Sequence, residues 1–91
     1  MIQGQLLIVD DDPQTQNFIH ECLTREGHNA DVVPDGLAAD RKLSEHSYRV
    51  VVSDVKLPGM DGLRLLSRHG GAGSFTRFLM VSGHSTIGDA V

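Results

Sequence analysis

The 91-residue sequence has one cysteine and no tryptophan, and its basic residues are fewer than its acidic ones. A single cysteine cannot form an internal disulfide, which argues against a secreted disulfide framework. We therefore expect Cys22 to be a small, buried hydrophobic residue of the core. Even the apolar run at residues 6–9 is too short for a membrane span or a signal-peptide core. These shortages favour a cytoplasmic chain with no membrane contact.

The balance of charged residues argues against nucleic acid as a direct partner. Eight Lys and Arg residues oppose 12 Asp and Glu residues, for a formal charge of −4, and the basic residues are scattered along the chain. A nucleic-acid-binding surface needs clustered positive charge, so we expect no direct contact with nucleic acid. The length and the 40% of hydrophobic residues allow one small domain, which we assign to residues 1–91.

Short apolar runs alternate with amphipathic stretches along the chain. The apolar runs predict four strands, at residues 6–9, 30–33, 50–52 and 78–81. Helical spacing and capping signals predict helices at residues 13–27, 37–43 and 63–66, and a first helical turn at 86–91. Strands that alternate with helices in this way imply right-handed crossovers and a parallel sheet. The fold class is therefore α/β.

Polar side chains follow three of the predicted strands where each strand ends. Asp10, Asp11 and Asp12 follow the first strand. Asp54 follows the third strand, and Ser82 follows the fourth. In parallel α/β sheets, ligands bind beyond the carboxyl ends of the strands. We therefore expect these side chains to meet at one edge of the sheet.

Carboxylates gathered at one edge repel one another unless a cation neutralises them. Mg²⁺ suits such a cluster, because it takes one or two carboxylates together with waters and phosphate oxygens. An aspartate can also act as a nucleophile towards phosphorus and carry the phosphoryl group as an acyl phosphate. The pattern predicts a Mg²⁺ site in which Asp54 is the nucleophile and the Ser82 hydroxyl contacts a phosphoryl oxygen.

Three separated motifs carry a family resemblance. They are Leu-Ile-Val-Asp-Asp-Asp-Pro at 7–13, Val-Val-Ser-Asp-Val-Lys-Leu-Pro-Gly-Met-Asp-Gly at 51–62 and Met-Val-Ser-Gly-His at 80–84. In order and spacing, the chain resembles the receiver domain of two-component response regulators, and residues 82–91 are most similar to receivers of the nitrogen-regulator type. The resemblance implies a flavodoxin-like, CheY-like fold of three layers with strand order 2-1-3-4. The family's fifth strand and last helix are missing from residues 1–91.

The resemblance also implies a role for each site residue. Asp54 is the residue phosphorylated by a sensor histidine kinase, and Ser82 is the hydroxyl that moves towards the phosphoryl group. Asp11 is the direct Mg²⁺ ligand, and Asp10 acts mainly through water. The backbone carbonyl of Lys56 completes the protein ligands. A receiver is a signalling domain that assists its own phosphorylation and dephosphorylation. Receivers of the nitrogen-regulator type often precede an ATPase and a DNA-binding output domain, which implies an output that regulates transcription.

Four neighbouring residues have lesser expected roles. Asp12 and Asp61 are expected to cap helices rather than to take part in chemistry. Lys56 and His84 lie two residues after Asp54 and Ser82, at the mouth of the predicted site. We hypothesise that these two side chains control the access of water to the acyl phosphate, and so its lifetime.

Two alternative functions stay open. The family's lysine at the end of the fifth strand has no counterpart here, because Lys42 and Lys56 are the only lysines and neither lies at a later strand end. A receiver-like interaction or dimerisation module that works without phosphorylation is therefore an alternative, and a Mg²⁺-dependent phosphohydrolase is a weaker one. If the chain ends at residue 91, strand 78–81 becomes an apolar edge, which predicts homodimers, swapping or aggregation.

Overall fold

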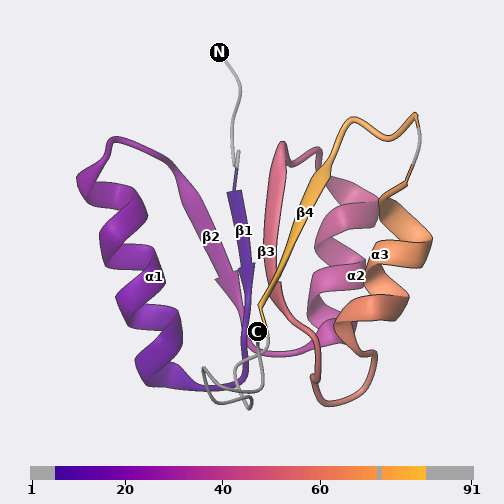
Figure 1. Ribbon diagram of the computed structural model, residues 1–91, viewed down its shortest axis with the longest axis horizontal. Helices are drawn as coiled ribbons and strands as arrows, with labels where there is room; N and C mark the ends of the chain where they lie inside the picture. Colours follow the sequence, from indigo (N-terminus) through magenta and orange to yellow (C-terminus); the bar gives the residue numbers. More distant parts are fainter. Residues whose placement is uncertain (1–5, 72, 82–91) are drawn as a thin grey trace, which may run out of the picture.

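A four-stranded parallel sheet forms the centre of the computed structural model, which describes residues 6–71 and 73–81 (Figure 1). The strand order is β2-β1-β3-β4, as predicted. The strands are β1 (Leu6–Val9), β2 (Ala30–Val33), β3 (Val50–Asp54) and β4 (Arg77–Val81). The helices are α1 (Pro13–Arg25), α2 (Gly36–Glu45) and α3 (Gly62–His69).

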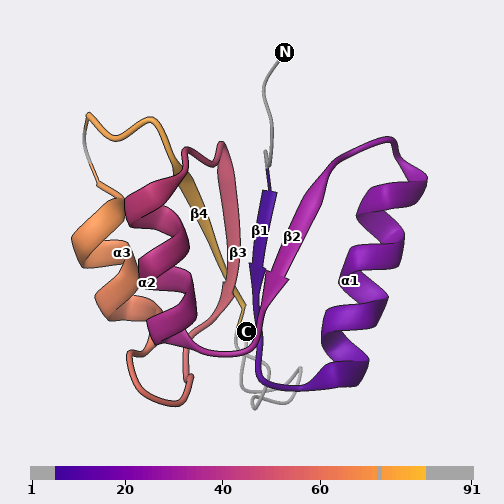
Figure 2. The ribbon, with the colours of Figure 1, turned by 180° about the vertical axis from the view of Figure 1, so that it is seen from behind.

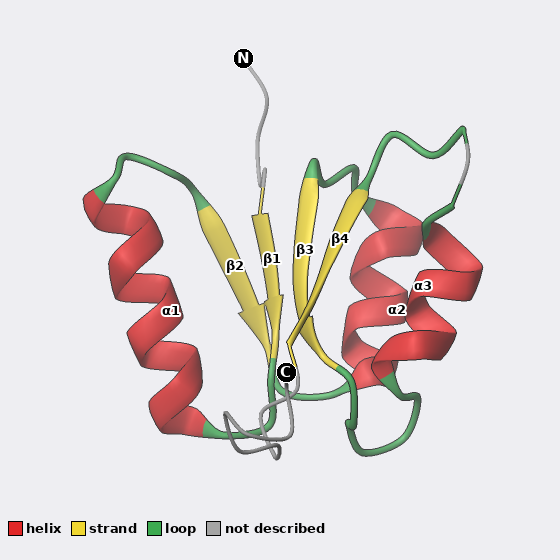
Figure 3. Cartoon of the chain, in the orientation of Figure 1, coloured by secondary structure: helices red, strands yellow, loops and turns green. Residues whose placement is uncertain are grey.

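Helices cover both faces of the sheet. α1 lies on one side, and α2 and α3 lie together on the other side, which gives three layers (Figures 2 and 3). This is the arrangement that right-handed crossovers between parallel strands produce when the chain reverses direction across the sheet. The carboxyl ends of all four strands consequently point to the same end of the molecule (Figure 1).

The register of β1 and β3 determines which residues lie side by side at the carboxyl ends of these strands. Val9 lies opposite Ser53 of β3, so the next residues, Asp10 and Asp54, emerge at the same level from adjacent strands. Every residue of β1 is buried, which explains its uninterrupted aliphatic sequence. β3 continues to Asp54, two residues beyond the predicted end, and thereby brings the carboxylate into the regular part of the sheet.

The hydrophobic core lies between the sheet and the pair α2 and α3. Its buried members are Leu7, Val9, Val33, Ala39, Tyr48, Val51 and Leu65. The Tyr48 hydroxyl, at the end of the sheet away from the acidic residues, donates to a carboxylate oxygen of Asp31 at 2.6 Å. Burial and the neighbouring carboxylate both raise the pKa of Tyr48, so its hydroxyl stays protonated. A polar group in the core is thus paired, as burial requires.

The predicted burial of Cys22 is wrong. α1 has no fully buried residue, and Ile19 and Leu23 are the apolar side chains of this helix that are partly covered, while Cys22 is exposed and Phe18 is 69% exposed. Residues four apart share one side of a helix. Phe18 and Cys22 therefore share a flank beside the Ile19 and Leu23 stripe, and the described residues leave that flank open.

Helix boundaries follow the capping signals. Asp12, Asp35 and Asp61 are the N-caps of the three described helices, and the carboxylate of each accepts a backbone N–H of the first turn. The predicted caps at Asp12 and Asp61 are confirmed. The predicted helical turn at 86–91 lies outside the described residues. Within the described ranges, the helices are all too short or too polar to span a membrane.

Candidate metal and phosphoryl site

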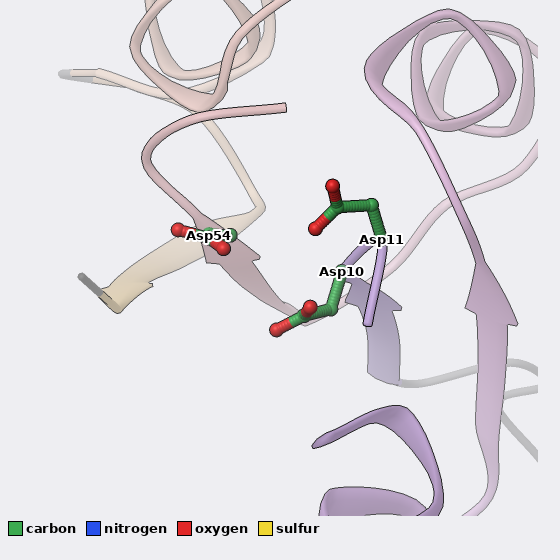
Figure 4. A group of neighbouring side chains, drawn as sticks. All are labelled: Asp10, Asp11 and Asp54. Carbon is green, nitrogen blue, oxygen red and sulfur yellow. The ribbon is translucent and has the colours of Figure 1, made fainter. Parts of the chain in front are cut away.

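Three aspartates from two strands meet beyond the carboxyl ends of the sheet. Asp10 and Asp11 follow β1, and Asp54 ends β3 (Figure 4). One carboxylate oxygen from each residue lies within 4.8 Å of the others. The structure therefore brings together the three carboxylates that were predicted to hold a metal ion. Asp12, predicted to be a cap, is not part of this group.

The three carboxylates differ in their exposure to solvent. Asp10 is 5% exposed and Asp54 is 3% exposed, whereas Asp11 is exposed. Burial raises the pKa of Asp10, and the negative charges of Asp54, Asp11 and Asp12 raise it further. A hydrogen bond from the backbone of Asp12 opposes this rise. A bound cation would offset both the lost hydration and the repulsion.

Hydrogen bonds hold Asp10 at the start of the β1–α1 loop. The backbone N–H of Asp12 donates to Oδ1 of Asp10 at 2.9 Å, and the side-chain amide of Gln16 donates to the Asp10 carbonyl. Asp12 itself is occupied as a cap, because it accepts from the Gln14 N–H at 3.3 Å and from the Thr15 hydroxyl at 2.7 Å. The Thr15 hydrogen bond holds the pKa of Asp12 below its usual value. The loop thus presents Asp10 and Asp11 and keeps Asp12 apart.

The main chain of Asp54 is fixed by close packing against the start of α3. The buried Ser53 hydroxyl donates to the Asp54 carbonyl at 2.9 Å. A Cβ placed on Gly62 would lie 2.2 Å from that same carbonyl oxygen, so only glycine fits there without displacement. Neither Gly62 nor Ser53 could be recognised from the sequence as a support of Asp54. The available signal for Ser53 is that a serine ends the valine run directly before Asp54.

Lys56 lies beside the carboxylates in the β3–α3 loop. Its backbone N–H donates to Oδ1 of Asp54 at 3.4 Å, and its side chain is exposed. This places the backbone N–H of Lys56 next to the acidic group, and the Lys56 carbonyl stays the predicted fourth protein ligand. The predicted switch hydroxyl of Ser82 and the side chain of His84 lie outside the described residues.

The donor set matches a hard divalent cation. All of the side-chain donors are carboxylate oxygens, which Mg²⁺ and Ca²⁺ prefer, and the group contains neither the imidazole nor the thiolate ligands typical of zinc. Two buried carboxylates and one exposed carboxylate leave the group accessible from the solvent side. Mg²⁺ keeps several waters and often binds phosphate oxygens, so an open site suits it.

Comparisons with known proteins agree with this geometry. Residues 6–91 match the family model described as the response regulator receiver domain. The transcriptional regulatory protein TctD of Salmonella typhimurium is 33% identical over 87 residues, which cover 96% of this chain and 39% of TctD. The transcriptional activator protein IrlR of Burkholderia pseudomallei is 36% identical over 87 residues, which cover 96% of this chain and 38% of IrlR. The chain thus spans about two-fifths of these relatives.

A solved structure shows the same fold. The response regulator protein TrrA of Thermotoga maritima, crystallised in complex with Mg²⁺ and BeF, superimposes with a TM-score of 0.79 at 26% identity. The match covers 88% of this chain and 70% of TrrA. The predicted receiver fold is therefore confirmed, including its strand order.

Proposed function

The chain belongs to the response regulator receiver family, and from this premise we propose that Asp54 accepts a phosphoryl group from a sensor histidine kinase in a Mg²⁺-dependent reaction. The observation that carries the proposal is the group formed by Asp10, Asp11 and Asp54, with one oxygen of each within 4.8 Å of the others. The complex of TrrA with Mg²⁺ and BeF supports Mg²⁺ as the ion.

The position of Asp54 supports a role as the nucleophile. Its carboxylate lies at the carboxyl end of a central strand, and its main chain is held by Ser53 and by the start of α3. A carboxylate oxygen attacks the phosphorus of a phosphohistidine, the new O–P bond forms, and the P–N bond breaks with its electron pair going to the imidazole nitrogen. The kinase histidine leaves, and Asp54 carries an acyl phosphate.

Asp10, Asp11 and the Lys56 carbonyl would hold the ion next to Asp54. When bound, Mg²⁺ offsets the negative charge of the carboxylates and of the phosphoryl oxygens. The N–H of Lys56 already donates to a carboxylate oxygen of Asp54 and restricts its orientation. We assign the contact with the phosphoryl group to the Ser82 hydroxyl, which follows β4 directly in the sequence. Movement of this residue would pass the signal to the neighbouring surface.

The family is a signalling family and not one of enzymes with a released product. TctD and IrlR are transcriptional regulators, and each extends well beyond the region that matches this chain. This supports a role as the regulatory part of a cytoplasmic transcriptional regulator whose output is made by a separate ATPase or DNA-binding domain. Autodephosphorylation at Asp54, which would limit the lifetime of the signal, is part of the same proposal.

One observation favours a second function, as an interaction module that works without phosphorylation. β4 lies at an edge of the described sheet, and within residues 6–71 and 73–81 no further strand pairs with it. Leu79 on this strand is 57% exposed, and Phe75 just before it is also exposed. An apolar edge strand tends to pair with another chain. Self-association of the 91-residue chain through β4 would be such an interaction.

The test is phosphorylation of the purified chain. The chain is incubated with a small phosphodonor, with and without Mg²⁺, and its intact mass is measured. We expect a single phosphate that is stable in acid and labile in base, that requires Mg²⁺, and that Asp54→Ala abolishes. Asp61→Asn is the matched control, because Asp61 lies outside the acidic group and asparagine caps a helix as well as aspartate does, so this variant should retain the phosphate.

The other outcomes separate the alternatives. No mass shift despite measurable Mg²⁺ binding would contradict the phosphoacceptor role and favour the interaction module. Release of phosphate from many equivalents of donor would favour the phosphohydrolase.

A further inference from the structure

The β3–α3 loop, residues 55–61, is anchored at two points on either side of Lys56. At the first, the Val55 N–H donates to the Val81 carbonyl at 3.0 Å, and the Val55 carbonyl accepts from the Gly62 N–H at 2.8 Å. At the second, the Pro58 carbonyl accepts from the Gly36 N–H at 3.3 Å. Only Lys56 and Leu57 lie between the two anchors.

Gly36 is the first residue of α2, and it is buried against this loop. A Cβ placed on Gly36 would lie 1.5 Å from the Met60 carbonyl oxygen and 2.5 Å from the Met60 carbonyl carbon. Both atoms belong to the backbone, so neither can rotate away as a side chain would. Gly36 is not among the glycines with positive φ, so the contact, and not its backbone conformation, requires glycine here. Any side chain at this position must push the loop and the helix apart.

A second contact extends the same junction. The side chain of Leu37 lies over Gly59, since a Cβ built on Gly59 would be 3.0 Å from Cγ of Leu37. Leu37 is itself 56% exposed, so this contact adds little to the core. The start of α2 is held in turn by its cap, in which Asp35 accepts from the Ala38 N–H at 2.8 Å. A rigid helix start therefore faces three successive loop residues, 58–60.

We propose that Gly36 is a positioning residue for the metal site. Gly36 leaves room for the Met60 carbonyl and donates its N–H to the Pro58 carbonyl, which fixes the second anchor of the loop. This anchor in turn sets the position of the Lys56 carbonyl, the proposed fourth ligand. The inference rests on the proposed Mg²⁺ site and extends it to a residue that contacts neither the ion nor the phosphoryl group. Because only Lys56 and Leu57 separate the two anchors, a shift of the anchor at Pro58 should also move the Lys56 carbonyl.

The test compares Gly36→Ala with wild type in two measurements. The first is the dissociation constant for Mg²⁺ alone, by calorimetric titration, which we expect to rise by about tenfold or more, the usual cost of disturbing the support of a metal ligand. The second is amide hydrogen exchange of Lys56 and its neighbours without metal, which we expect to accelerate relative to β1. Exchange does not depend on phosphorylation activity or on a bound ion.

Gly27→Ala is the matched control. Gly27 has a φ of +88°, so alanine is strained there and costs stability, but nothing lies within 4 Å of the added Cβ. It follows α1 at the opposite end of the sheet from the acidic residues. Its Mg²⁺ affinity and its loop exchange should match those of wild type, which separates the positioning effect from a general loss of stability.

Each outcome decides the matter. A folded Gly36→Ala protein with wild-type Mg²⁺ affinity or unchanged loop exchange overturns the inference and leaves the proposed function standing. If Gly36→Ala does not fold, Leu37→Ala takes its place, with a smaller rise in the dissociation constant expected and an unchanged constant overturning the inference. A wild-type chain that does not bind Mg²⁺ contradicts the proposed function itself, and the metal role of Gly36 with it.

Discussion

Replacing Asp10 by asparagine should stabilise the metal-free protein and remove its response to Mg²⁺. The asparagine side chain keeps an oxygen that can accept the Asp12 N–H, but it carries no charge. Wild-type Asp10 is almost completely buried and has an oxygen within 4.8 Å of oxygens of Asp11 and Asp54. In the absence of a cation, both the burial and the repulsion are unfavourable to the folded state.

The size of the effect follows from the distance. Two full charges 4.8 Å apart repel by about 3.5 kcal/mol at an effective dielectric constant of about 20. Water and counter-ions reach the group through the exposed Asp11, so we expect about half of this, roughly 2 kcal/mol, as a gain in the free energy of unfolding. For a domain of this size, that gain raises Tm by about 10 °C.

The assay is urea and thermal unfolding of wild type and Asp10→Asn, each in chelator and in excess Mg²⁺. Mg²⁺ should stabilise wild type in proportion to the logarithm of its concentration and should have little effect on Asp10→Asn. Asp61→Asn is the control, since asparagine caps a helix as well as aspartate does, and its Mg²⁺ response should equal that of wild type. Destabilisation by Asp10→Asn in chelator, or an undiminished Mg²⁺ response, would show that the charge of Asp10 is not what the cation offsets.

The pH dependence of this difference has a definite sign. The pKa of Asp10 is raised in the folded protein, so its protonated form is favoured by folding. This contribution to stability is fully present below the unfolded-state pKa and is lost as the pH rises through the folded-state pKa. The advantage of Asp10→Asn over wild type in chelator should therefore be largest near neutral pH and should shrink as the solution becomes acidic. A constant difference across this range would contradict the electrostatic explanation.

The remaining predictions concern the core, the mouth of the site and the edge of the sheet. Tyr48→Phe removes the hydrogen bond to Asp31 and should lower the free energy of unfolding by about 1–2 kcal/mol in urea, with no change in Mg²⁺ affinity. Lys56→Ala and His84→Ala should each change the dephosphorylation rate of the acyl phosphate. Unchanged rates in both variants would contradict the hypothesis that these side chains control the access of water. Leu79→Asp should convert a self-associated 91-residue chain to a monomer in size-exclusion chromatography, and a wild-type monomer would count against pairing through β4.

The sequence was sufficient to predict the parts of the fold that depend on neighbouring residues. The aliphatic run of β1 and the valine run of β3 define buried parallel strands, and the acids that follow them must then share one edge. Asp12 and Asp61 could be recognised as caps because capping depends on residues within one turn. The strand order could be predicted because the three motifs identify the resemblance to receiver domains, and this resemblance implies the order 2-1-3-4.

Features that depend on tertiary contact were not predictable in the same way. Cys22 has the spacing of a core residue, but spacing does not reveal which flank of α1 the sheet covers, and Cys22 is exposed. Gly36 and Gly62 have the sequence signature of turns and caps, while the carbonyl groups that require them come from other segments of the chain. The extra length of β3 depends on its pairing with β4, because Asp54 lies opposite Val81.

The most direct test of Asp54 as the phosphoacceptor is to locate the phosphoryl group in the chain. The chain is treated with Mg²⁺ and a phosphodonor, the acyl phosphate is reduced with borohydride, and the modified peptide is sequenced by tandem mass spectrometry. We expect residue 54, and no other aspartate, to be converted to homoserine. Conversion at Asp10 or Asp11, or an unmodified Asp54 in a protein that binds Mg²⁺, would contradict the phosphoacceptor role of Asp54.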